Sequence, residues 1–394
     1  MSGNASAYKI AFTKHRRRPG DKLFANDLDD VVDFGAGYYR GHSVKIIPHS
    51  ESNNSNFGGP IFCLHQYPGF MYLPNALSES FQKEIALLSL SKFCEPPHLT
   101  NIDNVPKKRG EETNVLKDGS LISMWDLYKS QLLNSDSEFR HKPINNTENN
   151  IERNAFHYYR SFDKLSWATL GYHYDWTNRS YREDFKSPMP EVLSSVGTYF
   201  SRVFNDQCLQ DNVNESKSKP VDDNNAKRDN FKASAAIVNY YNTKSNMGGH
   251  RDDLELDLTK PVISLSVGLP AIFLLGGKTK EDEPVIPILF RPGDVMILGG
   301  CSRLNYHGIA RILPSEIKLN PLRKEYESSK GNHQIHSISK LALNKKNKNS
   351  FESDDKEEIL YSPRDISAVN TFLHNHRINI NLRQVLPDGM EVIP

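Results

Sequence analysis

Two histidines and one aspartate stand where their side chains could share a metal ion. His250 and Asp252 are separated by one residue at the end of a predicted strand, and His307 stands at the start of a later strand. Because alternate residues of an extended segment point the same way, the imidazole of His250 and the carboxylate of Asp252 can face one ion. A second imidazole completes the set of two histidines and one carboxylate that holds non-haem Fe(II) and leaves positions open for a co-substrate and O₂. Taken alone, this spacing also fits ordinary polar loop residues.

A polar stripe on the last predicted strand indicates an anion inside the fold. Polar and apolar residues alternate along 377–383 of the segment 377–385, and the polar ones are Arg377, Asn379, Asn381 and Arg383. A buried face carries two arginines only where they meet anions, since burial of an unpaired charge is costly; otherwise this face is exposed. Asn239 and Tyr241 have the matching alternation on the segment 233–241. Because the guanidinium fork suits carboxylates, a dicarboxylate bound inside a barrel would account for the stripe.

The elements that must position these residues are mostly strands. Short β-branched runs separated by Gly and Pro turns follow residue 230, at 233–241, 262–268, 271–275, 285–290, 294–298, 308–313 and 377–385. Ahead of them, apolar residues at helical spacing predict helices over 76–92 and 190–204. Helices followed by a series of strands without helices between them predict a mainly β fold with supporting helices (α+β), an antiparallel sandwich or jelly roll.

Composition bounds the domain organisation. The chain has 394 residues and a formal net charge of +1, from 49 Lys+Arg and 48 Asp+Glu, which excludes a generally basic nucleic-acid coat protein. The polar excess lies in four segments, at 1–58, 99–155, 205–230 and 315–362. We therefore expect a disordered N-terminal segment over 1–58 and a single domain over 59–394, in which the other three segments are inserts.

Cysteines and apolar runs bear on the compartment. Cys63, Cys94, Cys208 and Cys301 include no CxxC pair, so neither a zinc knuckle nor a disulfide framework is indicated. No apolar run approaches the ~18 residues that span a bilayer, and no secretory signal is visible. The first 20 residues are basic and lack Asp and Glu, as in transit peptides, nuclear signals and disordered tails. We expect an intracellular protein of the nucleus and cytoplasm, with the mitochondrion as the alternative.

Further motifs lie between about residue 60 and 386. They are YPGF at 67–70, WATLGYHYDW at 167–176, NYY at 239–241, HRD at 250–252, TKPVISLSVGLPAIFLLGG at 259–277, GDVMI at 293–297, SRL at 302–304 and RININLRQV at 377–385. In this order they resemble the AlkB family of Fe(II)/2-oxoglutarate dioxygenases, and its homologue 1 branch most closely. The resemblance implies a double-stranded β-helix with N-terminal helices and a nucleotide-recognition lid.

The same resemblance implies the residues of the site. His250, Asp252 and His307 would hold Fe(II), with 2-oxoglutarate and O₂ as co-substrates. Arg377 would pair with the distal carboxylate of 2-oxoglutarate, assisted by Tyr241 and Asn239, and Asn379 lies in the same stripe. Arg383 would lie near the metal-side carboxylate of 2-oxoglutarate or orient Asp252.

The aromatic stretch at 167–176 fits a nucleobase substrate. In the family this segment forms the lid over the nucleotide, and a flipped base needs stacking partners. We predict that Trp167, Tyr172 and Tyr174 bind substrate, whereas Trp176 is as compatible with a place in the core.

The implied activity is oxidation of methylated bases in tRNA or DNA, with release of formaldehyde, succinate and CO₂. One alternative is a lyase at abasic DNA sites, which would need a lysine amine and no iron. A protein (histone) hydroxylase or demethylase is another, and an interaction scaffold on the same jelly roll is a non-enzymatic one. Removal of iron by a chelator separates them, because only the dioxygenase activities would be lost. The expected partner is nucleic acid, with no membrane, and the expected state is a monomer.

Overall fold

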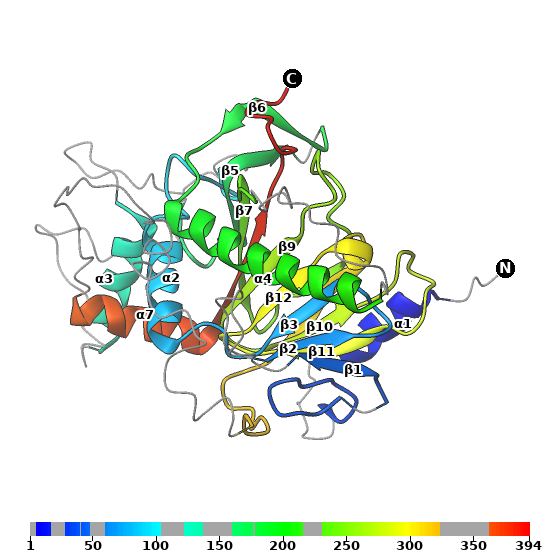
Figure 1. Ribbon diagram of the computed structural model, residues 1–394. Coiled ribbons are helices and arrows are strands. Elements are labelled where there is room, and N and C mark those ends of the chain that lie inside the picture. Colours follow the sequence, from blue (N-terminus) through cyan, green and yellow to red (C-terminus); the bar gives the residue numbers. More distant parts are fainter. Residues whose placement is uncertain are drawn as a thin grey trace, which may run out of the picture.

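Two antiparallel sheets form the fold (Figure 1). The computed structural model describes residues 5–16, 28–39, 41–47, 60–103, 122–136, 160–175, 178–215, 231–323 and 362–394. The larger sheet has the order β1 (Val44–Ile47), β2 (Ile61–Leu64), β3 (Phe70–Leu73), β12 (Val295–Leu298), β9 (Val262–Gly268), β14 (His376–Arg383), β7 (Ala235–Asn242), β5 (Trp167–Asp175) and β4 (Leu99–Thr100), with β6 (Ser180–Lys186) beside β5. The smaller sheet has the order β11 (Ile286–Phe290), β10 (Ala271–Leu275), β13 (His307–Ile312) and β8 (Met247–His250).

Aromatic side chains fill the space between the two sheets. Phe62, Phe70 and Tyr72 come from the larger sheet, and Phe273 and Phe290 come from the smaller one; all are buried in one cluster. Two facing antiparallel sheets with an apolar filling are the architecture of a jelly roll. The prediction of a mainly β, double-stranded β-helix fold with supporting helices is thereby confirmed.

Helices cover the outer face of the larger sheet. They are α2 (Glu79–Ser91), α3 (Met124–Asp136), α4 (Glu191–Glu215) and α7 (Pro363–Asn375). Ile378, Ile380 and Leu382 of β14 are fully buried in the cluster that also contains Phe81 of α2 and Phe200 of α4. The apolar residues of β14 therefore face the helices, which leaves its polar residues facing the smaller sheet.

The predicted elements are found within a few residues of their expected limits, except that α4 (Glu191–Glu215) runs well past the end expected at 204. The helices over 76–92 and 190–204 correspond to α2 and α4, and each strand predicted after residue 230 is present. Three helices, α1 (Ala7–His15), α3 and α7, were not predicted; α3 lies within the expected insert over 99–155, and α4 continues into the one over 205–230. The described part of the chain contains no helix long and apolar enough to cross a membrane.

The N-terminal segment differs from the expected disorder wherever the structure describes it. Within residues 1–58 it contains α1 (Ala7–His15) and β1, and Tyr8, Val32 and Phe34 are buried. Tyr8 packs on the outer face of the smaller sheet, whereas Val32 and Phe34 belong to the cluster between the sheets. A few apolar anchors thus order the described parts of a segment whose average composition is polar.

Candidate active site

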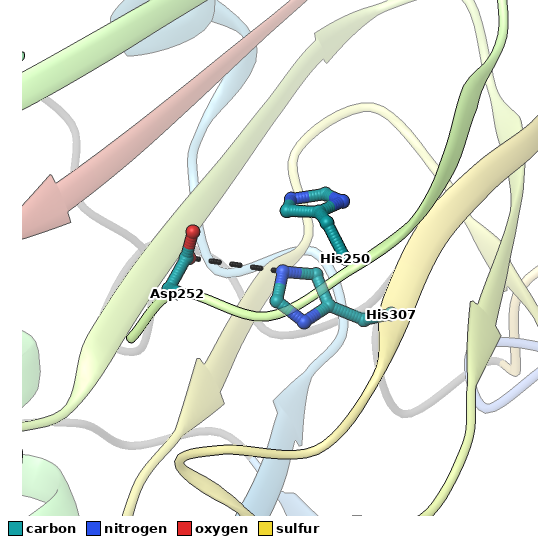
Figure 2. Close-up of side chains that lie close together, drawn as sticks. All are labelled: His250, Asp252 and His307. Carbon is teal, nitrogen blue, oxygen red and sulfur yellow. Dashed lines mark ion pairs between the residues drawn. The ribbon is translucent and has the colours of Figure 1, made fainter. Parts of the chain in front are cut away.

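The two histidines and the aspartate meet on the smaller sheet. β8 pairs with β13 so that His250 stands directly opposite His307, and their ring centroids lie 4.5 Å apart. Asp252 follows in the loop after β8, and its Oδ2 lies 3.7 Å from His307 Nε2 (Figure 2). One ligand atom from each of the three residues lies within 4.8 Å of the others. The three side chains could therefore hold one divalent ion between them.

Backbone carbonyls orient both imidazoles. His250 Nδ1 lies 3.0 Å from the carbonyl oxygen of Gly248, and His307 Nδ1 lies 3.0 Å from that of Asn305. A carbonyl can only accept, so each Nδ1 carries a proton, and in the neutral imidazole the lone pair for a metal is then on Nε2. Burial and the neighbouring His250 lower the pKa of His307 to about 4, which keeps its imidazole in the neutral form that a ligand requires.

Asp252 is held as a carboxylate by the charges around it. Burial alone would raise its pKa, but Arg383, His307 and His250 together hold the pKa of Asp252 well below its ordinary value. Arg383 Nη2 donates to Asp252 Oδ1 over 2.8 Å. The structure thus favours the second of the two positions expected for Arg383, beside the aspartate.

A second buried carboxylate, Glu255, was missed as a site residue. Its Oε2 accepts from Arg303 Nη2 over 2.8 Å, and its Oε1 lies 3.2 Å from Arg383 Nε. Arg303 also donates to the backbone carbonyl of Asp252. Buried arginines need counter-charges, and Glu255 supplies one to Arg303 and Arg383, which come from distant parts of the sequence, so no local pattern pointed to it.

We expect Glu255→Gln to destabilise the protein strongly. The substitution keeps the shape of the side chain but removes the charge between two buried guanidinium groups, and breaking such a pair costs about 3–5 kcal/mol. Asp253→Asn is the matched control, because Asp253 pairs with Arg251 at the surface, where an ion pair contributes less than about 1 kcal/mol. Denaturant unfolding of both variants measures the difference, and equal losses would show that the charge of Glu255 is dispensable.

Arg377 has the features of an anion-binding residue. It is fully buried, and its Nη1 donates to Ser266 Oγ over 2.6 Å and to the carbonyl oxygen of Leu269 over 3.1 Å. Its Nε and Nη2 are buried and have no hydrogen-bond partner among the described residues. Burial lowers the pKa of Arg377 to about 10, so the guanidinium remains charged at neutral pH. Two unpartnered donors on one buried cation fit a carboxylate, which is the group predicted here.

The other residues of the predicted dicarboxylate site share the face of Arg377. Tyr241 of β7 stands directly opposite Arg377, and Asn239 stands opposite Asn379, so the four side chains share one face of the sheet. Asn379 Nδ2 donates to the carbonyl oxygen of Leu265 over 2.9 Å, and this hydrogen bond links β14 to the neighbouring strand β9. The structure therefore brings this set together, with Arg383 further along the same strand, beside Asp252.

The predicted substrate residues fall into two places. Trp167 is half-buried and stands opposite Asn239 on β5, so it shares the polar face. Tyr172 and Tyr174 are buried in a separate apolar cluster with Ala235, which Leu254 packs against, close to Asp252 in sequence. Trp176 lies outside the described residues.

A glycine explains why both groups of aromatic residues reach the same side of the sheet. Gly171 has a φ of +68°, and a Cβ there would collide with the backbone of Ser234. This left-handed residue interrupts the alternation of side chains along β5. Before it, odd-numbered Trp167 lies on the face of Asn239. After it, even-numbered Tyr172 and Tyr174 contact Ala235, which lies on that same face.

Comparison with known proteins gives the family. The sequence profile of the 2OG-Fe(II) oxygenase superfamily matches residues 126–383. The DNA N(6)-methyladenine demethylase ALKBH1A of Arabidopsis thaliana is 29% identical over 74% of this chain and 77% of its own length. The nucleic acid dioxygenase ALKBH1 of Homo sapiens is 29% identical over 78% of this chain and 70% of its own. The tRNA demethylase abh1 of Schizosaccharomyces pombe is 29% identical over 65% of this chain and 72% of its own length. The profile covers more than half of the sequence, and the chain therefore belongs to the 2OG-Fe(II) oxygenase superfamily, in the homologue 1 branch of the AlkB family.

Proposed function

We propose that this protein oxidises N-methyl groups on nucleic-acid bases and that His250, Asp252 and His307 hold its Fe(II). The observation that carries the proposal is a buried arginine with two unpartnered donors, on the polar face of the strand that also brings Arg383 to Asp252. The names of the relatives support nucleic acid as the substrate, since they include a DNA demethylase and a tRNA demethylase.

The residues of this chain fit both groups that the family uses. The three ligands offer two imidazoles and one carboxylate, and Arg377 would take the distal carboxylate of 2-oxoglutarate. When bound, Fe(II) with 2-oxoglutarate and O₂ supplies the oxidising power that converts an N-methyl group to formaldehyde, with succinate and CO₂ as the other products. Arg383, which also pairs with Glu255, holds Asp252 in place, and buried aromatic side chains fill the space between the sheets.

Nucleoside mass spectrometry is the experiment that tests this function. Methylated tRNA and methylated DNA are incubated with the protein, with and without 2-oxoglutarate, and each methylated nucleoside is counted before and after. We expect a methylated nucleoside of tRNA to be lost, and only when both 2-oxoglutarate and Fe(II) are present. A chelator of Fe(II) should stop this loss. Cleavage of abasic DNA that survives the chelator would instead support the lyase alternative.

Trp167→Ala should lower the rate of base oxidation while 2-oxoglutarate is still consumed without substrate. Trp167 lies beside Asn239 and is half-buried, so its ring can stack on a base, and such stacking contributes about 1–3 kcal/mol. The expected loss in kcat/KM is about fivefold to a hundredfold. Trp167→Phe keeps a stacking face and should retain most of the activity. If Trp167→Ala abolishes 2-oxoglutarate consumption as well, the ring is part of the core.

The monomeric state and the compartment stay predictions. Light scattering after gel filtration measures the first, and imaging of the tagged full-length chain measures the second.

A further inference from the structure

The strand that carries His250 has little support from its own sheet. β8 is an edge strand of the smaller sheet, with β13 as its neighbour, and the pairing between them is irregular between His307 and Ile309. Edge strands joined by few ladder bonds are among the first parts of a sheet to open. The distance between the two histidine rings therefore needs a support from outside the two strands.

Such a support lies directly behind the histidines, on the outer face of the smaller sheet. Tyr8 of α1 is 3% exposed, and its ring lies over Gly249, Gly276 and Gly308. Gly249 precedes His250 and Gly308 follows His307. Since successive residues of a strand point to opposite faces, the glycines face Tyr8 while the histidines face the site.

The three glycines leave the room that the tyrosine ring occupies. A Cβ on Gly249 would lie 2.7 Å from Cδ1 and 2.9 Å from Cζ of Tyr8, and one on Gly276 would lie 2.9 Å from Cδ2. One on Gly308 would lie 2.9 Å from the Tyr8 hydroxyl oxygen, and also 2.6 Å from the carbonyl oxygen of Met247. None of the three has a positive φ, so their own backbone conformation does not demand glycine, although at Gly308 the neighbouring strand does. At Gly249 the three atoms nearest to the added Cβ all belong to the ring of Tyr8.

Tyr8 is itself fixed from both ends. Its backbone N–H donates to the carbonyl oxygen of Lys280 over 2.9 Å, and its hydroxyl lies 3.4 Å from the carbonyl oxygen of Leu274. Ser6 caps the helix by accepting from the N–H of Lys9. A ring held in this way resists movement of β8 away from β13.

We propose that Tyr8 is a positioning residue for the metal centre, whose ring, seated on Gly249, Gly276 and Gly308, holds the two histidine-bearing strands at the separation that one ion requires. The inference rests on the proposed function, because it takes His250 and His307 as metal ligands. Residues that orient metal ligands without touching the metal typically contribute 10- to 100-fold to metal affinity, and we expect an effect of about tenfold or more for the loss of this ring.

Co(II) binding tests the proposal without any need for turnover. The affinity of the purified full-length protein for Co(II), and the absorption spectrum of bound Co(II), are measured for wild type, Tyr8→Ala, Tyr8→Phe and Ile10→Ala. We expect Tyr8→Ala to weaken binding about tenfold or more and to change the spectrum, because the ligand geometry loosens. Tyr8→Phe keeps the ring and should bind as wild type does. Ile10 lies on the same helix but is 59% exposed, so Ile10→Ala should have no effect.

A double-mutant cycle separates positioning from general stability. Gly249→Ala should weaken Co(II) binding in wild type, where the added methyl group collides with the ring, and should cost little in the Tyr8→Ala protein, where the space is free. Circular dichroism confirms folding, and Tyr8→Leu replaces Tyr8→Ala if the alanine variant does not fold. Equal Co(II) affinity of folded Tyr8→Ala and wild type would overturn the proposal, as would an equal cost of Gly249→Ala in both backgrounds. If His250→Ala also binds Co(II) as wild type does, the metal centre itself is wrongly assigned and the proposed function fails with it.

Discussion

His250→Ala should abolish 2-oxoglutarate turnover while the protein stays folded. His250 stands opposite His307 with ring centroids 4.5 Å apart, and its Nδ1 is bound to the carbonyl of Gly248, which leaves Nε2 for the metal. When one of the three protein ligands is removed, only two remain to hold the metal. We expect a loss in kcat of more than about a hundredfold, since even the outer partners of metal ligands account for about 10- to 100-fold in metal affinity or activity.

Succinate formation at saturating Fe(II) measures this loss, and thermal unfolding reports on the fold. His65→Ala is the matched control, because His65 is an exposed histidine at the end of β2 and should tolerate the same substitution without effect. Wild-type succinate formation by His250→Ala would remove the histidine from the metal centre, whatever the fate of the other two ligands.

The sequence predicted best those parts of the site in which alternation along a strand decides the direction of a side chain. β14 is the clearest case, because Ile378, Ile380 and Leu382 face the helices while Arg377 and Arg383 face inward. The predicted parity put Asn239 and Tyr241 on the same face as Arg377, and the register of β7 against β14, which parity does not fix, places them opposite Asn379 and Arg377. Strands with one polar and one apolar face carry this information in every residue.

The features that sequence reasoning missed depend on contacts between distant segments. Glu255 looks like one acid among several after His250, and its role follows from two arginines that arrive from other elements, Arg303 and Arg383. Tyr8 lies in a polar, basic segment, and its partners are glycines more than two hundred residues away. Neither periodicity nor composition records such long-range pairings.

Arg377→Met should weaken 2-oxoglutarate binding about tenfold to a hundredfold. The guanidinium keeps two buried donors without a partner among the described residues, and a charge-assisted hydrogen bond to a carboxylate contributes roughly 1.5–3 kcal/mol net. Metal binding should change little, because Arg383, at the other end of β14, is the arginine that contacts Asp252. Isothermal titration with 2-oxoglutarate in the presence of Co(II) measures the affinity, and Co(II) titration alone measures the metal site.

The same variant distinguishes an arginine kept for a ligand from one kept for the fold. In the free protein two unsatisfied donors and a buried charge cost free energy, so methionine, which fills similar space without polar atoms, should leave the thermal midpoint unchanged or raise it. The stabilisation of wild type by added 2-oxoglutarate should shrink in the variant in proportion to the lost affinity. Arg364→Met, at an exposed position of α7, should change neither quantity. A variant that unfolds more easily but binds 2-oxoglutarate as tightly as wild type would show that Arg377 serves the core through Ser266 and Leu269, and that the co-substrate carboxylate binds elsewhere.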